Sequence, residues 1–437
     1  MSTEAFSGSG HLTCRHATEW PCDFWLAQLF NGRIVVQVWN VQRIPHDLNR
    51  WLDKCEPFDL IGTLNDGRSA MTRGIHWTWS FGLTEKMIEG VVHRPGYMEI
   101  SRTPRIEIPS QRVICEISNL FLGRVVGPIE SNVGQACIQF NRLSCHADNR
   151  RRMEALKTAG ILSSVSVEPV ELISEDHLGD MVDTLCSLLT FAQRSPVSCV
   201  AQHSQDVSKT IVRSRYQEPV FYYPTMFRPL IPSENLAAFV QDTFGNYSRQ
   251  WKLWDLGHAI DHYVQAIALH SAWSQAVGIF TALETLKNAY LQQPRKNNLE
   301  YFVSEGSFRK RRIASQVMEL LGSNFVIFND LPDDEKDALS GKIRGLNQRA
   351  YKLILKKMFQ ELRMPVDEDD LALLVRLRNQ IIHGGSPDYQ KGPWKNPSKA
   401  SEVASRFAGL VEKTILAILD FQGDSERYDQ VAVPSDK

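Results

Sequence analysis

The stretch RLRNQIIHGG, at residues 376–385, has an unusual mixture of residue types for a buried helix. It places two arginines, an asparagine and a histidine in a run with helical apolar spacing, and two glycines end it. In a helical projection Arg378 falls among the apolar positions, whereas Arg376, Asn379 and His383 group on the other side. An arginine on an apolar face needs an acidic partner or a phosphate, and a histidine can exchange protons near neutral pH.

A carboxylate on an apolar helix face likewise needs a partner of opposite charge, and one occurs in AWSQAVGIFTALETLKNAYL, at residues 272–291. Four residues mark an apolar stripe on this predicted helix: Trp273, Val277, Phe280 and Leu291. Glu284 lies on the same stripe, so we expect it to face Arg378 or His383, either within one chain or across a dimer. A buried strut between two helices is the structural alternative to a functional pair.

The segment that carries the motif has helix signals at both ends. Asp367 suits the N-cap, the three acidic residues after it suit the positive end of the helix dipole, and Gly384 suits the left-handed position that ends a helix. His383 is therefore expected in the final turn, where unsatisfied carbonyl groups favour an imidazolium.

The chain as a whole divides into a β-rich first half and a helical second half. Short alternating runs such as RIVVQVW and RVICEIS predict strands, and later segments with apolar residues three and four apart predict a bundle of five or more helices. The predicted fold is α+β multidomain. Its expected parts are a flexible N-terminus (1–20), a β-rich sensor or regulatory domain (21–235), an α-helical domain (236–423) and a flexible tail (424–437).

Composition excludes several classes of protein. The 437 residues are 43% hydrophobic, which is enough for two or three cores, and the net charge of -1 excludes a global field for nucleic acid or an anionic membrane. No run has the length of a membrane span and the N-terminus lacks the apolar core of a signal peptide. A cytoplasmic protein is expected, with its eight cysteines reduced and mostly buried.

Two basic stretches are candidates for binding phosphate. The loop SPDYQKGPWKNPSK interleaves aromatic and basic residues, among which Trp394 could stack on a base and Lys391 and Lys395 could meet phosphates. SFRKRR, at residues 307–312, places four basic residues at a helix start. An ordinary solvated loop or helix face has the same composition.

Three segments together resemble the ApeA-like group of HEPN domain proteins: FTALETL, GLNQRAYKLILKKMFQEL and LVRLRNQIIHGG. In that group a β-rich N-terminal domain precedes an all-α HEPN bundle. Arg378 and His383 match the family motif, an arginine followed a few residues later by a histidine near a helix end, and Arg376 also fits the spacing. The resemblance covers about residues 250–423 and is architectural over residues 1–240.

The resemblance implies a metal-independent endoribonuclease whose site lies at a dimer interface and needs no cofactor. His383 would move protons, Arg378 would brace the phosphate, Asn379 would orient the imidazole or a phosphate oxygen, and Glu284 would hold Arg378. RNA carries its own nucleophile, the 2′-hydroxyl, and the expected product is a 2′,3′-cyclic phosphate. One histidine per chain favours a homodimer, which brings a second copy.

The same resemblance implies a role in bacterial antiviral defence by abortive infection. An unknown trigger from phage or cell would release cleavage of host RNA, with tRNA as one candidate substrate. The alternative is a non-catalytic HEPN module that dimerises or binds a ligand. His258 and His262 have zinc-like spacing, but the sequence offers no third ligand at a matching position, so structural histidines are favoured and no metal site is expected.

Overall fold

The computed structural model divides the chain into two compact units, Met1–Tyr247 and Ser248–Lys437. The α+β class is confirmed, because the described strands all lie in the first unit and the second is helical. The predicted boundary at residue 235 falls just before α4 (Leu236–Gln250), and the units divide within that helix. The structure describes residues 5–14, 19–41, 57–78, 87–102, 112–122, 128–156, 158–171, 173–206, 208–219, 229–294, 307, 312–324, 331–333, 335–336, 338–339, 350–384, 392–421 and 423.

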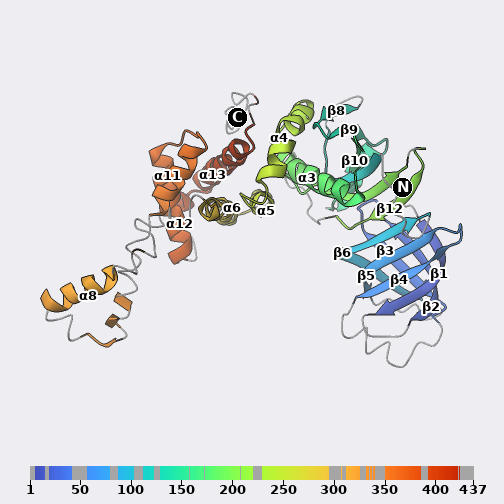
Figure 1. The fold of residues 1–437 in the computed structure, drawn as a ribbon, viewed down its shortest axis with the longest axis horizontal. Coiled ribbons are helices and arrows are strands. Elements are labelled where there is room, and N and C mark those ends of the chain that lie inside the picture. The colour runs from blue at the N-terminus through green and yellow to red at the C-terminus, as the bar shows by residue number, and fades with distance from the viewer. Residues whose placement is uncertain are drawn as a thin grey trace. The chain divides into compact units, whose positions relative to one another are not determined.

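Six strands of the N-terminal unit close into a barrel (Figure 1). Their order is β3-β2-β1-β4-β5-β6, and β3 pairs with β6 to complete the ring, with every pairing antiparallel. The strands are β1 (Ala5–Cys14), β2 (Trp20–Gln28), β3 (Ile34–Trp39), β4 (Phe58–Leu64), β5 (Ser69–Thr78) and β6 (Ile88–Ser101). Alternate residues point inward, and the fully buried Phe24, Phe58 and Leu26 belong to one apolar core.

The predicted flexible N-terminus is wrong for residues 5–14, which form β1 and pair with both β2 and β4. Small residues in this strand hide the usual apolar alternation, yet Phe6 and Leu12 are buried in the core. The small residues are needed where β1 crosses β4 closely: a Cβ on Gly8 would lie 2.1 Å from the Thr63 carbonyl oxygen, and one on Gly10 would lie 2.2 Å from that of Ile61.

The long strand β6 joins the barrel to a second group of strands. Its residues 88–92 pair with β3, whereas residues 98–101 pair with β12. From β12 the sheet continues in the order β11-β7-β10-β9-β8, and helices α2 and α3 pack on it. These elements are β7 (Arg112–Ser118), β8 (Ile129–Asn132), β9 (Ala136–Arg142), α2 (His146–Leu156), β10 (Ile161–Pro169), α3 (Glu175–Gln193), β11 (Ser198–Gln205) and β12 (Ile211–Tyr216).

The C-terminal unit is built from amphipathic helices around α6. The described helices are α5 (Leu256–Ile267), α6 (Ala272–Gln292), α8 (Ile313–Asn324), α11 (Tyr351–Glu361), α12 (Glu368–Gly384) and α13 (Pro397–Ile418). The predicted helix at residues 272–291 is α6, and it begins where the Ser271 hydroxyl accepts a hydrogen bond from the Ser274 amide and caps the helix. Gly278 then lets α6 approach α5 closely, because a Cβ there would lie 2.6 Å from Ala266 Cβ.

Two further expectations concern thiols and membranes. No disulfide is found among the cysteines whose side chains the structure describes, in line with the prediction of reduced thiols; Cys22, Cys115 and Cys186 are buried, whereas Cys137 is exposed. Burial, aided by the nearby Asp23 carboxylate, raises the pKa of the Cys22 thiol to about 11.

Within the described residues, no helix combines the length and apolar character needed to span a lipid bilayer.

The crossing of β1 over β4 gives a stability prediction. Gly8→Ala should lower the free energy of unfolding by about 2 kcal/mol or more, because the new methyl group meets the rigid backbone of β4. Gly179→Ala in α3 is the control, since no atom lies within 4 Å of its added Cβ, and it should be neutral or stabilising. Urea unfolding followed by tryptophan fluorescence measures both, and equal stability of the two variants would contradict the close crossing.

Candidate active site on the helical unit

Helix α12 is held at its N-terminal end by charged contacts with two other helices. The Asp367 carboxylate accepts a hydrogen bond from the Asp369 amide at 3.1 Å, as expected of an N-cap residue. Glu368 pairs with two lysines of α11, Lys352 and Lys356, which lower the pKa of its carboxyl to about 2. On α13, Arg406 pairs with Asp370. These contacts fix the direction in which the rest of α12 presents its side chains.

Farther along α12, Arg378 pairs with Glu284 of α6. The Arg378 Nε donates to Glu284 Oε1 at 2.9 Å, and each side chain is 25% exposed. The sequence left Arg378 and His383 as alternative partners of Glu284, within a chain or between chains, and the structure shows the arginine pairing within one chain. Because both groups are partly exposed, a guanidinium edge can still reach a ligand in solvent.

Glu284 also holds a second cation that sequence reasoning missed. Lys287 lies one turn along α6, and its Nζ is 2.7 Å from Glu284 Oε2 with only 12% of the side chain exposed. One carboxylate therefore contacts two basic side chains, so the cluster of Glu284, Lys287 and Arg378 has one more basic group than acidic groups. The spacing of Glu284 and Lys287 is a known signal for a helical ion pair, and it could have identified this lysine.

Tyr351, the first residue of α11, lies against both cations. Its ring centroid is 4.5 Å from the Arg378 guanidinium carbon and 5.3 Å from Lys287 Nζ, within the range of cation–π contact. Its hydroxyl is buried and has no hydrogen-bond partner among the described residues. Burial, together with the Glu284 charge, holds the pKa of the Tyr351 phenol well above its usual range, so the ring stays neutral. No sequence pattern pointed to Tyr351.

The other motif residues of α12 differ in their exposure and in their described contacts. Asn379 is exposed, and its Oδ1 lies 3.5 Å from Arg378 Nη1. Arg376 is also exposed. His383 belongs to the last turn of α12, four residues after Asn379, but its side chain lies outside the described residues. Of the two arginines that fit the motif, Arg378 is therefore the one whose described contacts position it beside this helix end.

The loop after the motif corrects one prediction. Trp394 does not offer a free ring for stacking on a base, because it is only 5% exposed and packs edge-on against Trp273 of α6 at 4.9 Å. Lys395, its neighbour in a short 3-10 helix (Gly392–Lys395), is exposed. Lys391 lies outside the described residues, as does most of the basic run at 307–312.

The histidines with zinc-like spacing have a different arrangement. His258 Nδ1 lies 2.6 Å from an Asp255 carboxylate oxygen, and this hydrogen bond raises the pKa of His258. No three potential metal-ligating side chains cluster within the part of the chain that the structure describes. His258 therefore forms an exposed ion pair with Asp255 at the start of α5.

The cluster around Arg378 can bind an anion and hold it near the end of α12. Its excess positive charge lies at a partly exposed surface, and the fixed Arg378 side chain keeps terminal N–H donors that Glu284 does not use. In comparisons with known proteins, no family model, curated protein or solved structure matches this chain.

The stacked tyrosine makes the arrangement testable. Tyr351→Phe should leave stability unchanged or slightly higher, because it keeps the ring and removes a buried hydroxyl that lacks a partner. Tyr351→Leu should lower the free energy of unfolding by about 1–2 kcal/mol more than Tyr351→Phe, since it also removes the cation–π contacts. Urea unfolding curves compare the two; equal losses would show that the hydroxyl, not the ring, supports the cluster.

Proposed function

We propose that the C-terminal unit is a HEPN-type endoribonuclease domain whose active site includes Arg378 and His383. One observation carries the proposal: on the same helix as His383, Arg378 is fixed by the Glu284 carboxylate and the Tyr351 ring while remaining partly exposed. A cation held in this way beside a histidine-bearing helix end is suited to a phosphodiester.

The chemistry needs few protein groups, because the substrate supplies the nucleophile. The RNA 2′-oxygen attacks the adjacent phosphorus and loses its proton to a base, and the P–O5′ bond breaks as the 5′-oxygen takes up a proton. The products are a 2′,3′-cyclic phosphate and a 5′-hydroxyl, with no net gain or loss of protons. His383 transfers protons, and Arg378 stabilises the additional negative charge on the phosphorane oxygens.

Glu284 and Lys287 set the charge that Arg378 presents. Glu284 uses the Nε side of the guanidinium, which leaves the Nη groups for a phosphate oxygen and for Asn379. Without Lys287, the Glu284 charge would cancel that of Arg378; with it, the cluster stays net positive. Arg378 is accordingly assigned the role in phosphate binding, and Arg376 is a supporting cation.

Cleavage in EDTA tests the proposal. Purified protein incubated with total RNA or tRNA should give discrete fragments that end in cyclic phosphate. His383→Ala and Arg378→Ala should each lower the rate about 100-fold or more, because each removes a group that acts in the transition state. Arg376→Ala should have a much smaller effect, since Arg376 is exposed and outside the Glu284 cluster. Fragment ends are identified by mass spectrometry.

The control for His383→Ala is His258→Ala, which removes an exposed histidine from the same unit and should cleave like the wild type. Circular dichroism establishes that the variants are folded. Full activity of folded His383→Ala would exclude the proposed site. If wild type and variants are equally inactive on every RNA, the binding module that dimerises or recognises a ligand becomes the better account.

Because one histidine must serve both as base and as acid, we propose that two chains share the site in a homodimer. Sedimentation equilibrium should then give the mass of two chains. A tenfold excess of His383→Ala chains should slow wild-type cleavage, since most wild-type chains would then lie in dimers that lack one histidine. Chains that carry both Arg378→Ala and His383→Ala should slow wild-type cleavage in the same way. Bovine serum albumin at the same concentration should have no effect. A monomeric mass with no inhibition would exclude a shared site.

We further propose that the barrel unit regulates cleavage and that the protein acts in antiviral defence by abortive infection. This setting follows from the resemblance to the ApeA-like group. The trigger would be a phage-derived or cellular molecule that the N-terminal unit recognises.

A further inference from the structure

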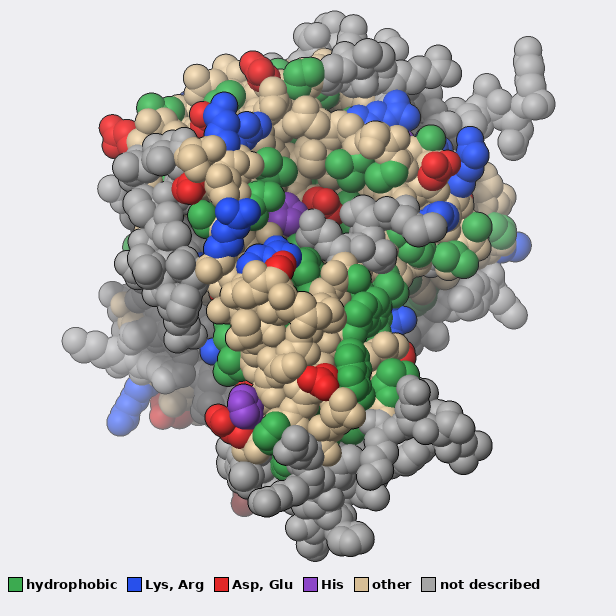
Figure 2. Space-filling view, turned by 90° about the vertical axis from the view of Figure 1, so that its right-hand side faces the viewer, with side chains coloured by type: hydrophobic (Ala, Val, Ile, Leu, Met, Phe, Trp, Pro, Cys, Tyr) green, Lys and Arg blue, Asp and Glu red, His purple; other side chains and the backbone are tan. Residues whose placement is uncertain are grey.

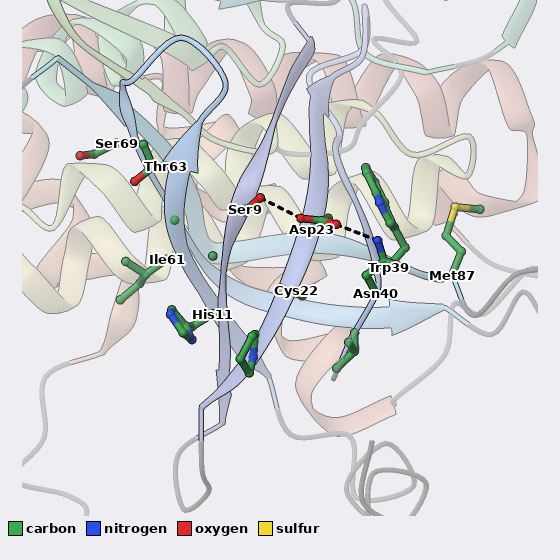
Figure 3. A pocket seen from close by; sticks show the side chains of 14 residues that line it. Ser9, His11, Cys22, Asp23, Trp39, Asn40, Ile61, Thr63, Ser69 and Met87 are labelled. Atoms are coloured by element: carbon green, nitrogen blue, oxygen red, sulfur yellow. Dashed lines mark hydrogen bonds between the residues drawn. The ribbon is translucent and has the colours of Figure 1, made fainter. Parts of the chain in front are cut away.

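The outer face of the barrel carries a row of side chains that crosses the strands, with short polar residues between a tryptophan at one end and an arginine at the other. Strand register aligns the row from β3 to β12, and its members in order are Trp39, Asp23, Ser9, Thr63, Ser69, Ser101 and Arg213. Directly paired residues of neighbouring strands share a face, so these side chains lie side by side. The part of the row from Trp39 to Ser69 lines a pocket, and Figure 3 shows its labelled members in that sequence across the strands.

At one end of the row a carboxylate is fixed beside an aromatic ring. Asp23 accepts hydrogen bonds from the Ser9 hydroxyl and the Asn40 amide, each at 2.8 Å, as the dashed lines in Figure 3 mark. These two bonds lower the pKa of Asp23, so it is an acceptor at neutral pH. Trp39 is half-buried beside it. None of the described residues that line the pocket is a lysine or an arginine, and the Asp23 carboxylate and the Trp39 ring favour a ligand that donates hydrogen bonds and has a flat face.

At the other end of the row the sheet presents arginines. Arg73 and Arg215 are exposed, and both lie over the Tyr97 ring, at 6.0 Å and 4.2 Å from its centroid. Neither of these two guanidinium groups contacts a carboxylate among the described residues. Arg213 beside them pairs with Glu99 at 3.5 Å. Three arginines and one acid leave two excess positive charges here, which suit phosphate groups.

Among the described residues coloured in Figure 2, lysine and arginine side chains occur in separate small groups. This agrees with the net charge of -1 and means that affinity for a polyanion must come from local clusters. The arginines around Tyr97 are such a cluster: strand register places Arg73 of β5 opposite Tyr97 of β6, and Arg215 of β12, which pairs with Glu99 two residues along β6, reaches the same ring.

We propose that this row binds a segment of single-stranded RNA, with phosphates on Arg73 and Arg215 and an unstacked base against Trp39 and Asp23. The proposal rests on the proposed function for the choice of RNA and assigns the barrel a part in holding the substrate. Base amino and imino groups are the donors that a carboxylate accepts. An extended strand also fits the length, because five strand spacings of about 4.8 Å separate β2, which carries Asp23, from β12, which carries Arg215.

Two other occupants fit the surface less well. A peptide that adds a strand needs a free edge, and each of the six barrel strands already pairs on both sides. Duplex RNA buries its bases in the stack, so it cannot place one against Trp39 and Asp23. Single-stranded RNA supplies both the anionic groups and an accessible base.

The test is fluorescence anisotropy with a fluorescein-labelled ten-nucleotide single-stranded RNA, measured between about 50 and 200 mM salt. Every chain carries His383→Ala, so that cleavage does not affect the reading. Adding Arg73→Ala and Arg215→Ala should weaken binding about tenfold and reduce the slope of log affinity against log salt by about 1.4, which corresponds to two lost phosphate contacts. Trp39→Leu should weaken binding about tenfold with the slope unchanged, because stacking releases no counterions.

The matched control removes two arginines from α2 of the same unit, Arg150→Ala and Arg151→Ala, and should leave both affinity and slope unchanged; Arg151 is 81% exposed. Absence of RNA binding, an unchanged slope in the Arg73/Arg215 variant, or an equal loss in the control would overturn the proposal, as would equally tight binding of the matching duplex. Binding and cleavage are separate readings. If the Arg73/Arg215 variant keeps the wild-type salt slope while the wild type cleaves RNA, only the barrel site is rejected. If that variant shows the expected lower slope but the wild type does not cleave RNA, only the nuclease is rejected.

Discussion

The candidate site depends on the permanent charge of Arg378. A guanidinium does not lose its proton in a protein, so an arginine on the inner face of a helix requires a carboxylate at a defined place. Glu284 of α6 provides it, and the Tyr351 ring covers the pair from α11. The same cation thus constrains three helices at once. Because Glu284 also binds Lys287, the constraint leaves positive charge available for a substrate, whereas an isolated Glu284–Arg378 strut would leave none.

In the barrel, the main constraint is the close approach of two strands, and uncharged residues meet it. Closing six strands into a ring forces β1 and β4 together, and only glycine fits at the tightest contacts. Ser9, Thr63 and Ser69 face outward near this crossing, and these short hydroxylated side chains help to line the pocket. A requirement of backbone packing therefore also shapes the surface to which we assign RNA. The arginines of β5 and β12 lie beyond the crossing, where side chains have room to stack on Tyr97.

The two units share a way of presenting cations. Arg378 lies over the Tyr351 ring in one unit and Arg215 lies over the Tyr97 ring in the other, and such a ring holds a guanidinium in place without neutralising it. A salt bridge fixes the group but cancels its charge, as Glu284 would do to Arg378 if Lys287 did not share that carboxylate. Stacking fixes it and keeps the charge, and that is what a phosphate-binding surface needs on a protein with almost no net charge. On the proposed function, one tyrosine supports the site of cleavage and the other the strand that is cleaved.

The sequence by itself determined the α+β organisation and the helix that carries Arg378 and His383, because these depend on local periodicity and capping. It also indicated that Arg378 and Glu284 each need a partner, since burial of a charge is unfavourable whatever the fold. Only the tertiary structure decided that they pair with each other and that the Tyr351 ring contacts both Arg378 and Lys287. It also decided that Trp394 is buried, because aromatic residues in a polar loop look alike whether they face solvent or a helix. The row across the barrel was invisible for the same reason: strand register brings together residues that no sequence spacing connects.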